Sequence, residues 1–329
     1  MNRILITGAL GFVGSNILNY FSDKEKYWLI ALDQKKTENN KYQEFYSWHN
    51  IDSIQWNNID IVIHLAGKAH DTKNSPAAQY YFNINVGLTQ KIFQHFLKSS
   101  AIKFIFFSSV KAVADSVTGD QLNEEVLPNP KTPYGKSKLE AEKYILNEWE
   151  KWKEEETASR RDNEWKKVYI LRPCMIHGPG NKGNLNLLFK LQQKGLPWPL
   201  GAFENKRSFC SIDNILFVVQ QFIEKNIESG IYHVADDEAL STNQLITLIA
   251  FSQSKKAKIW SIPVKSIKAI ARVGDFLHLP LNSERLRKLT ESYLVSNQKI
   301  KHALGINKMP VTAIDGIQKT LESFKKSRV

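Results

Sequence analysis

The sequence is poor in cysteine and has no long apolar run. Its two cysteines, Cys174 and Cys210, cannot form a disulfide framework, which favours a reducing compartment such as the cytoplasm. A membrane-spanning helix needs about 18 or more apolar residues, and the densest stretches, Trp28–Leu32 and Phe104–Phe107, have only the length of strands. Glycines interrupt the first apolar segment and no small-residue cleavage site follows it, so we predict neither a secretory signal nor an integral membrane segment.

The composition also excludes fibrous, disordered and repeat proteins. Gly 16 and Pro 11 are too few for a fibrous chain, and 42% hydrophobic residues in 329 are too many for disorder. No repeat of 20–50 residues, the period of solenoid proteins, is present. Acidic residues are outnumbered, 33 against 45 Lys and Arg, giving a net charge of +12. Because no nucleic-acid module accompanies this charge, we predict an anionic small molecule as partner and no nucleic acid.

The first half of the chain alternates strand-like and helix-like segments. Apolar runs predict strands, and segments with helical spacing lie between them, including 12–21, 76–98 and one that begins near Pro133. Continuous apolar strands that alternate with helices indicate a parallel sheet covered on both faces, a doubly wound α/β fold. The predicted strands are 3–7, 28–33, 61–66, 103–109 and 168–172.

The second half has a weaker rhythm. Proline and glycine cluster at 172–180 and 195–201, which predicts loops around a pocket. Another strand is predicted at 231–236 and a helix from about Thr242, and the C-terminal third is helical and basic. The charged run at 148–167 is typical of a solvated helix extension.

A glycine motif follows the first predicted strand directly. Gly8, Gly11 and Gly14 are spaced three apart and lead into a helix. Such glycines let the backbone turn tightly and approach a pyrophosphate, and the helix N-terminus then offers free N–H groups to it. Asp33 ends the next strand, where a carboxylate would accept the ribose hydroxyls of a dinucleotide. That carboxylate favours NAD, although Lys35 and Lys36 keep NADP possible. The alternative interpretation of the glycine motif is a purely structural turn that binds no cofactor.

A tyrosine and a lysine are placed for proton transfer. Tyr134 and Lys138 stand four residues apart at the start of a predicted helix and therefore share one face. A neighbouring ammonium group lowers the pKa of a phenol, which would let Tyr134 act as an acid or base near neutral pH. Tyr20 and Lys24 show that the same spacing arises by chance. Tyr134 differs because it follows Ser109, which ends the 103–109 strand at the edge where open α/β sheets bind ligands.

These elements together resemble the extended short-chain dehydrogenase/reductase superfamily of nucleotide-sugar epimerases, dehydratases and reductases. The resemblance is carried by TGALGFVG (7–14), HLAG (64–67), Asn85 in NINV, SS (108–109), YGKSK (134–138) and LRP (171–173). It implies a Rossmann fold with a smaller C-terminal α/β domain, and the catalytic set Ser109, Tyr134 and Lys138, with Ser108 as the alternative serine. It further implies that the cofactor is bound by Gly8, Gly11, Phe12, Val13, Gly14, Asp33, Leu65, Ala66, Gly67, Asn85, Ser108, Tyr134, Lys138 and Pro173. His64 and Asn85 are equally explained as internal polar residues with satisfied hydrogen bonds.

The downstream half resembles the sugar-nucleotide part of that superfamily. On this resemblance residues 1–172, with about 208–236, form the NAD(P)-binding domain, and 173–207 with 237–329 form the substrate domain. GNKGNLNLL (180–188) resembles the segment that holds the uracil and diphosphate, and KRSFCSIDN (206–214) the segment whose arginine pairs with the diphosphate. The alternative is that Arg207 is a surface residue without a function in binding. The residues implied in substrate binding are Lys111, His177, Asn184 and Arg207.

Among the reactions of this superfamily, the resemblance favours reduction of a 4-keto sugar. SSVK (108–111), 196–208 and 234–242 resemble bacterial reductases of UDP-4-keto-6-deoxy-N-acetylhexosamines in O-antigen and capsule synthesis. A 4,6-dehydratase is disfavoured, because that chemistry requires an acidic pair where Val110 and Lys111 stand. A UDP-hexose 4-epimerase with retained NAD is the alternative, and a non-catalytic dinucleotide-binding regulator a lesser one. The resemblance also implies a homodimer that forms through helices near 76–98 and 134–150. The apolar residues at helical spacing in these segments are equally typical of a core. No metal site is predicted.

Overall fold

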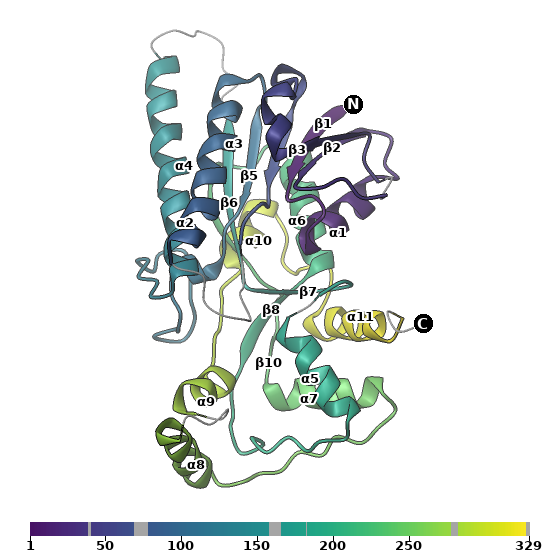
Figure 1. The fold of residues 1–329 in the computed structure, drawn as a ribbon, viewed down its shortest axis with the longest axis vertical. Helices are drawn as coiled ribbons and strands as arrows, with labels where there is room; N and C mark the ends of the chain where they lie inside the picture. The colour runs from purple at the N-terminus through teal and green to yellow at the C-terminus, as the bar shows by residue number, and fades with distance from the viewer. Residues whose placement is uncertain (39–40, 69–77, 158–165, 182, 278–281, 327–329) are drawn as a thin grey trace.

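The chain forms one large and one small β-sheet (Figure 1). The description rests on a computed structural model that covers residues 1–38, 41–68, 78–157, 166–181, 183–277 and 282–326. The large sheet has seven strands in the order β3-β2-β1-β4-β5-β6-β9, and every neighbouring pair is parallel. Its strands are β1 (Asn2–Thr7), β2 (Tyr27–Asp33), β3 (Glu44–Ser47), β4 (Ile61–His64), β5 (Lys103–Phe107), β6 (Lys167–Pro173) and β9 (Gly230–Val234).

Both faces of this sheet are covered by helices, as the apolar strands predict. In β1 the alternating residues Ile4 and Ile6 contribute to one core cluster and Leu5 to the other. The first cluster is completed by α1 (Phe12–Phe21) and α6 (Ile212–Glu224), and the second by α3 (Gly87–Lys98) and α4 (Pro133–Thr157). The predicted doubly wound Rossmann sheet is therefore confirmed.

The order of strands reverses direction at the centre of the sheet. The chain proceeds outward from β1 to β2 and β3, and then returns to place β4 on the other side of β1, with Thr7 beside His64 at their carboxyl ends. Open α/β sheets bind ligands at this kind of switch point, because the loops after the two strands separate there. The fold thus brings the glycine turn and the segment after His64 to one crevice.

The helix predicted over 76–98 is two helices. Within the described residues, α2 (Ala78–Asn85) and α3 (Gly87–Lys98) are separated at Val86, and residues 76–77 lie outside the described chain. Short 3₁₀ turns accompany the strands at η1 (Trp48–Ser53), η2 (Trp56–Asn58) and η3 (Val110–Ala112). The apolar side chains expected at a dimer surface are in large part core: Ile92, Phe93, Phe96 and Ile145 are 0% exposed.

The rest of the chain surrounds a small sheet of β7 (Met175–His177), β8 (Arg207–Ser211) and β10 (Ala239–Leu240). In Figure 1 this part lies below the large sheet, with α8 and α9 at one side of it. The short strands β3, β7, β8 and β10 were not predicted, because two to five residues carry too little periodicity. The helices around the small sheet are α5 (Asn184–Gln193), α7 (Thr242–Ser252), α8 (Val264–Phe276), α9 (Ser283–Thr290) and α11 (Ala313–Lys326). Helix α10 (Gln298–Leu304) instead packs on the large sheet, with Ile300 and Leu304 in its first core cluster. Among the helices described, none has both the length and the apolar character needed to cross a bilayer.

Candidate active site

The glycine turn approaches its neighbours so closely that side chains are excluded. Gly8 has a φ of 65°, and a Cβ there would lie 2.8 Å from the Ala66 backbone nitrogen. A Cβ on Gly14 would lie 2.6 Å from the carbonyl oxygen of Ala9. Gly11 is the N-cap of α1, and no side chain caps the helix there. The first turn of α1 therefore offers N–H groups to an anion in the crevice.

Asp33 connects the end of β2 to this turn. Its two carboxylate oxygens accept hydrogen bonds from the backbone N–H groups of Leu10 (2.8 Å) and Gln34 (2.7 Å). The carboxylate is partly exposed at the crevice, where it can also accept hydroxyl groups. Phe12 and Val13 form the first turn of α1 beside it.

A buried hydrogen-bonded chain holds the segment after β4. Thr89 donates to the Asn85 carbonyl oxygen (2.6 Å), so its hydroxyl must accept from Nε2 of His64 (3.0 Å). The other ring nitrogen, Nδ1, then accepts from the Thr7 hydroxyl (2.6 Å), which itself accepts the Ala66 N–H (3.2 Å). Burial lowers the pKa of His64 to about 3, so the ring is neutral. This chain sets the path of the Leu65–Gly67 loop over the crevice.

Asn85 clamps the same loop to α4. Its Oδ1 accepts the backbone N–H of Lys68 (2.7 Å), and its Nδ2 donates to the Lys68 carbonyl (3.1 Å) and the Ser137 hydroxyl (2.9 Å). A Cβ on Gly67 would lie 2.9 Å from Asn85 Oδ1 and 3.2 Å from Lys138 Nζ. The loop after β4 and the predicted catalytic lysine are therefore neighbours.

Ser109, Tyr134 and Lys138 come together at the carboxyl end of β5. Ser109 is the N-cap of η3, and its side chain is hydrogen-bonded to the Tyr134 phenol. Lys138 is buried, and its Nζ donates to the carbonyl of Phe107 (2.8 Å) and lies 4.9 Å from the Phe106 ring centroid. Burial lowers the pKa of Lys138 to about 8. Ser109 and Tyr134 are thus bonded to each other, and Lys138 is anchored to the end of the same strand.

The expected depression of the tyrosine pKa is wrong for this arrangement. Burial raises the pKa of the Tyr134 phenol above its ordinary value, and Tyr81 raises it further, while the hydrogen bond from Ser109 lowers it. The Lys138 ammonium instead faces the Phe107 carbonyl. Desolvation outweighs the Ser109 hydrogen bond because a buried phenolate loses its hydration.

A buried ion pair lies next to Lys138 and Ser108. Arg172 donates Nε to Oε1 of Glu142 (2.9 Å) and a terminal nitrogen to Oε2 (2.5 Å), and both side chains are at most 3% exposed. Ser108, predicted to bind the cofactor, donates to the same Glu142 carboxylate. Glu142 follows Lys138 by one helical turn, a signal that was readable in the sequence but was missed.

Lys111 and Arg207 meet the C-terminal end of α9. Lys111 donates to the Asp115 carbonyl (2.9 Å) and lies 4.1 Å from the Tyr293 ring centroid, so its ammonium group packs against the protein and is not freely solvated. Arg207 donates Nε to the Glu291 carbonyl (3.1 Å) and a terminal nitrogen to that of Lys288. Burial lowers the pKa of Lys111, the Asp115 and Glu291 carboxylates raise it, and the charges of Arg207 and Lys288 lower it further. We call Lys111 and Arg207 the positively charged wall; it lies beside the end of β5, and the two carboxylates lie close to it.

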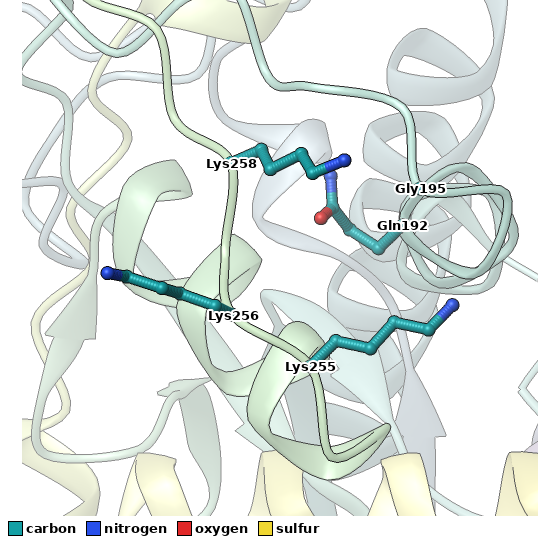
Figure 2. Close-up of a pocket in the computed structure, with 5 residues that line it drawn as sticks. All are labelled: Gln192, Gly195, Lys255, Lys256 and Lys258. Atoms are coloured by element: carbon teal, nitrogen blue, oxygen red, sulfur yellow. The ribbon is translucent and has the colours of Figure 1, made fainter.

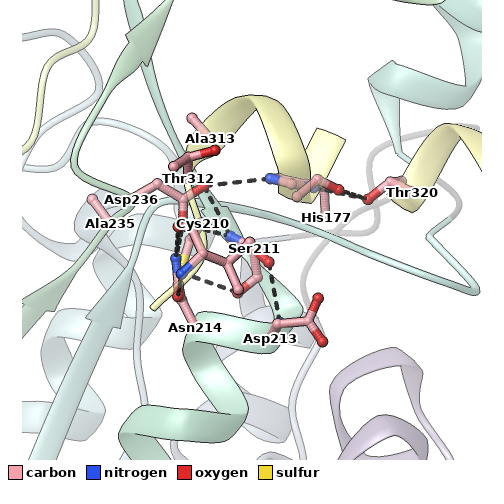
Figure 3. A network of polar contacts seen from close by, with 12 residues as sticks. His177, Cys210, Ser211, Asp213, Asn214, Ala235, Asp236, Thr312, Ala313 and Thr320 are labelled. Atoms are coloured by element: carbon pink, nitrogen blue, oxygen red, sulfur yellow. Dashed lines mark hydrogen bonds and ion pairs between the residues drawn. The ribbon is translucent and has the colours of Figure 1, made fainter. Parts of the chain in front are cut away.

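His177 lies apart from this wall, inside a buried network (Figure 3). Its Nδ1 is 2.9 Å from the Thr320 hydroxyl and its Nε2 3.5 Å from a carboxylate oxygen of Asp236. Asp236 also accepts from the Ser211 backbone N–H (2.9 Å) and Asn214 Nδ2 (2.7 Å). The network joins β7, β8 and α11, and the structure does not bring His177 together with Tyr134.

Two further predicted residues are placed less informatively. Pro173 ends β6 and is paired with Val234. Asn184 begins α5, and its side chain lies outside the described residues. A separate surface pocket of about 360 Å³ lies between α5 and the segment after α7 (Figure 2), and it contains none of the predicted site residues. Its lining is Gln192, Gly195, Lys255, Lys256 and Lys258.

The chain is similar to known proteins in both sequence and fold. Residues 4–235 match the model of the NAD dependent epimerase/dehydratase family. The chain is 27% identical to a UDP-glucose 4-epimerase of Vibrio cholerae, over 98% of this chain and 95% of that protein. It is 26% identical to the N-acetyl-alpha-D-glucosaminyl-diphospho-ditrans,octacis-undecaprenol 4-epimerase of Escherichia coli O157:H7, over 95% and 88%. The fold matches a Bacillus cereus UDP-glucuronic acid 4-epimerase solved with NAD, with a TM-score of 0.72, 20% identity and coverage of 99% and 100%.

Proposed function

The chain belongs to the NAD-dependent epimerase/dehydratase family of enzymes, and from this membership we propose that it transfers a hydride at C4 of a UDP-sugar. The observation that carries the proposal is the meeting of Ser109, Tyr134 and Lys138 at the carboxyl end of β5. A regulator without turnover would not need a hydrogen-bonded phenol with a buried lysine one helical turn away.

The cofactor is NAD, the cofactor of this family, and the crevice fits it. The glycine turn leaves no room for side chains where a pyrophosphate would lie, and Asp33 presents a carboxylate where the adenosine ribose would lie. Lys138 and the Leu65–Gly67 loop would face its nicotinamide half. When bound, NAD supplies the acceptor and donor of the hydride.

The side chains of the site would move the accompanying proton. The phenolate form of Tyr134 would take the proton of the C4 hydroxyl as the hydride leaves C4, and the resulting phenol would return that proton to the oxygen when a hydride is added back. Ser109 would hold the sugar oxygen within reach of the phenol. Lys138, held by the Phe107 carbonyl, would stabilise the negative charge that arises on Tyr134 during the transfer.

Of the possible C4 reactions, 4-epimerisation is supported best. Two relatives that match nearly the whole chain are 4-epimerases, and beyond the NAD that would accept and return the hydride, a C4 epimerisation needs only the three side chains of the site. Reduction of a UDP-4-keto-6-deoxy-N-acetylhexosamine in surface polysaccharide synthesis is the second candidate. It is favoured by Lys111, a cation that follows Ser109 by two residues at the positively charged wall.

We assign the two parts of the chain separate tasks. Residues 1–172 with about 208–236 would bind NAD, and 173–207 with 237–329 would bind the nucleotide sugar. Arg207 lies beside Lys111 and would pair with the diphosphate. Some of its N–H groups donate to carbonyls at the end of α9, and its remaining N–H groups would donate to the diphosphate oxygens. For His177 and Asn184 a substrate contact stays a prediction. We also propose a cytoplasmic location and a homodimer, whose surface would have to be formed by side chains other than those buried in α3 and α4.

The test is a product assay with three substrates. Purified protein is incubated with UDP-N-acetylglucosamine, UDP-glucose and an enzymatically prepared UDP-4-keto-6-deoxy-N-acetylhexosamine, each with and without added NADH or NADPH, and products are identified by NMR. An epimerase converts a UDP-hexose to its C4 epimer without added reduced cofactor. A reductase consumes the 4-keto sugar only with stoichiometric NAD(P)H. Absence of both products, with NAD bound, would contradict the proposal.

A further inference from the structure

Helix α8 has three distinct faces, and one of them is apolar and exposed. Successive side chains of a helix are about 100° apart, so residues at spacings of three, four and seven share a face. One face, Ile267, Ala271 and Gly274, is buried against the core. A second arc carries Ile270, Val273, Phe276 and the C-cap residue Leu277, which are 52% to 83% exposed. The third arc of the helix, which completes the circle between the apolar arc and the buried face, carries the exposed cations Lys265, Lys268 and Arg272.

The surrounding segment holds much of the positive charge of the molecule. Between residues 255 and 290 the sequence has nine Lys or Arg and two acidic residues, a net +7 of the total +12. One of the two acids, Asp275, accepts the Ser283 N–H (2.9 Å) and hydroxyl (2.5 Å), which ties α8 to α9. A helix that exposes apolar side chains beside a row of cations is typical of helices that lie in the plane of a membrane surface.

We propose that α8 docks the protein on an anionic bilayer surface, with Val273, Phe276 and Leu277 entering the headgroup boundary and Lys265, Lys268 and Arg272 contacting lipid phosphates. Charge complementarity favours this partner over a second copy of the chain, because a symmetric contact through α8 would bring two +7 segments together. The docking is peripheral, in keeping with the lack of a spanning helix among the described residues.

The docking surface is rigidly joined to the site. Ile267 and Ala271 of α8 pack with Leu286 of α9 in one core cluster. The carbonyls at the end of α9 accept the Arg207 guanidinium, whose charge acts on Lys111 next to Ser109. A bilayer under α8 would therefore lie at a fixed position relative to the positively charged wall. The inference does not depend on the identity of the sugar or of the reaction.

The experiment is vesicle flotation with the full-length protein. Vesicles of phosphatidylcholine alone are compared with vesicles that also contain phosphatidylglycerol, at low and high salt. We expect the protein to float with the mixed vesicles at low salt and to be released in part by high salt. It should stay unbound with phosphatidylcholine alone, because apolar insertion and charge are both required.

Two variants separate the apolar and the charged contributions. V273S/F276S should weaken binding to mixed vesicles about tenfold or more, and K265Q/K268Q/R272Q should do the same and remove the salt dependence. Phe251→Ser is the matched control, because Phe251 is also largely exposed (74%, against 83% for Phe276) but lies on α7. It should bind like the wild type. Circular dichroism and NAD binding verify that each variant is folded.

Three results would overturn the proposal. These are a wild-type protein that does not float with anionic vesicles, a V273S/F276S variant that floats as the wild type does, and a Phe251→Ser variant that loses binding to the same extent. If V273S/F276S instead lowers the mass of an oligomer in light scattering and vesicle binding is absent, α8 is a contact between copies. Turnover in solution is measured in parallel, so a failed docking experiment is distinguishable from a failed functional assignment.

Discussion

At the scale of single residues, the proposed chemistry depends on how a buried phenol can exchange a proton. Burial raises the pKa of Tyr134, and the Ser109 hydroxyl partly offsets this by its hydrogen bond. Lys138 is held one helical turn away with its pKa lowered to about 8. Because a protonated phenol cannot take a proton, Tyr134 would have to ionise before it acts as a base, and its raised pKa means that bound NAD and the Lys138 ammonium would have to stabilise the phenolate.

Replacing Tyr134 with Phe removes the proton relay and leaves the ring in place. We expect turnover to fall by about 10²–10⁴, the usual contribution of general acid–base catalysis, with NAD affinity little changed. The measurement is kcat on the substrate that the product assay identifies. Tyr20→Phe is the control, because Tyr20 has a lysine at the same spacing, Lys24, but lies on the surface of α1. Near-full turnover of Tyr134→Phe would refute the catalytic assignment.

Lys111 tests the role of the positively charged wall. Its ammonium group lies over Tyr293 and near Arg207, where it would stabilise negative charge that develops on a sugar oxygen. Lys111→Met should lower kcat on a 4-keto substrate at least about tenfold, roughly 1.4 kcal/mol, with little change in NAD affinity. Lys136→Met, an exposed position on α4, is the control. If the Lys111 variant turns over at the wild-type rate, the reductase candidate loses its supporting residue.

At the scale of elements, the turn between β1 and α1 determines cofactor binding. Gly14→Ala would place a Cβ 2.6 Å from the Ala9 carbonyl oxygen, so the turn must move. We expect NAD affinity to fall about tenfold or more, measured by isothermal titration calorimetry. Gly87→Ala is the matched control, because no atom lies within 4 Å of its Cβ position in α3. That variant should keep NAD affinity and gain about 0.5–1 kcal/mol of stability. Equal NAD affinity in both variants would show that the turn does not bind the cofactor.

At the scale of the whole molecule, two buried histidines make stability depend on pH. Burial lowers the pKa of His64 to about 3 and that of His233 to about 4, whereas both titrate near 6.5 when unfolded. As the pH falls below 6.5 the unfolded chain takes up protons that the folded chain does not, so stability decreases down to about pH 4. The slope is roughly 1.4 kcal/mol per pH unit for each histidine.

Urea unfolding between pH 7 and pH 5 measures this dependence. The midpoint should fall with pH in the wild type, and His233→Gln should reduce the slope because one of the two buried rings no longer titrates. His49→Gln, at an exposed position, should leave the slope unchanged. A wild-type midpoint that is constant over this range would show that the two rings are accessible to protonation when folded.

The proposed homodimer is a second property of the whole molecule. The helices implied in it, α3 and α4, bury Ile92, Phe93, Phe96 and Ile145 in the monomer core, so a dimer would use their outer, more polar faces. Light scattering at micromolar concentration should give twice the chain mass of 37.8 kDa. A monomer mass at that concentration would refute the dimer.

The sequence predicts the local motifs of the site but not the pairs that form between distant residues. The glycine turn, Asp33 and the pair Tyr134 and Lys138 were readable because strand and helix periodicity is local and places each motif at a strand end. The spacing of Glu142 from Lys138 was readable too, but its pairing with Arg172 was not, because these two residues lie 30 apart on different elements and meet only across a packed core. The same holds for Arg207, whose partners on α9 lie more than 80 residues away.

The sequence by itself determined the sheet, the order of its main strands and helices, and the chemistry available at the crevice. Only the tertiary structure decided which polar residues face that crevice: it placed His177 in a buried network with Thr320 and turned the Lys138 ammonium toward the Phe107 carbonyl. It also left the apolar arc of α8 exposed while burying the similar residues of α3. The physical reason is that a periodic pattern specifies which side chains share a face, whereas the partner of that face depends on segments distant in sequence.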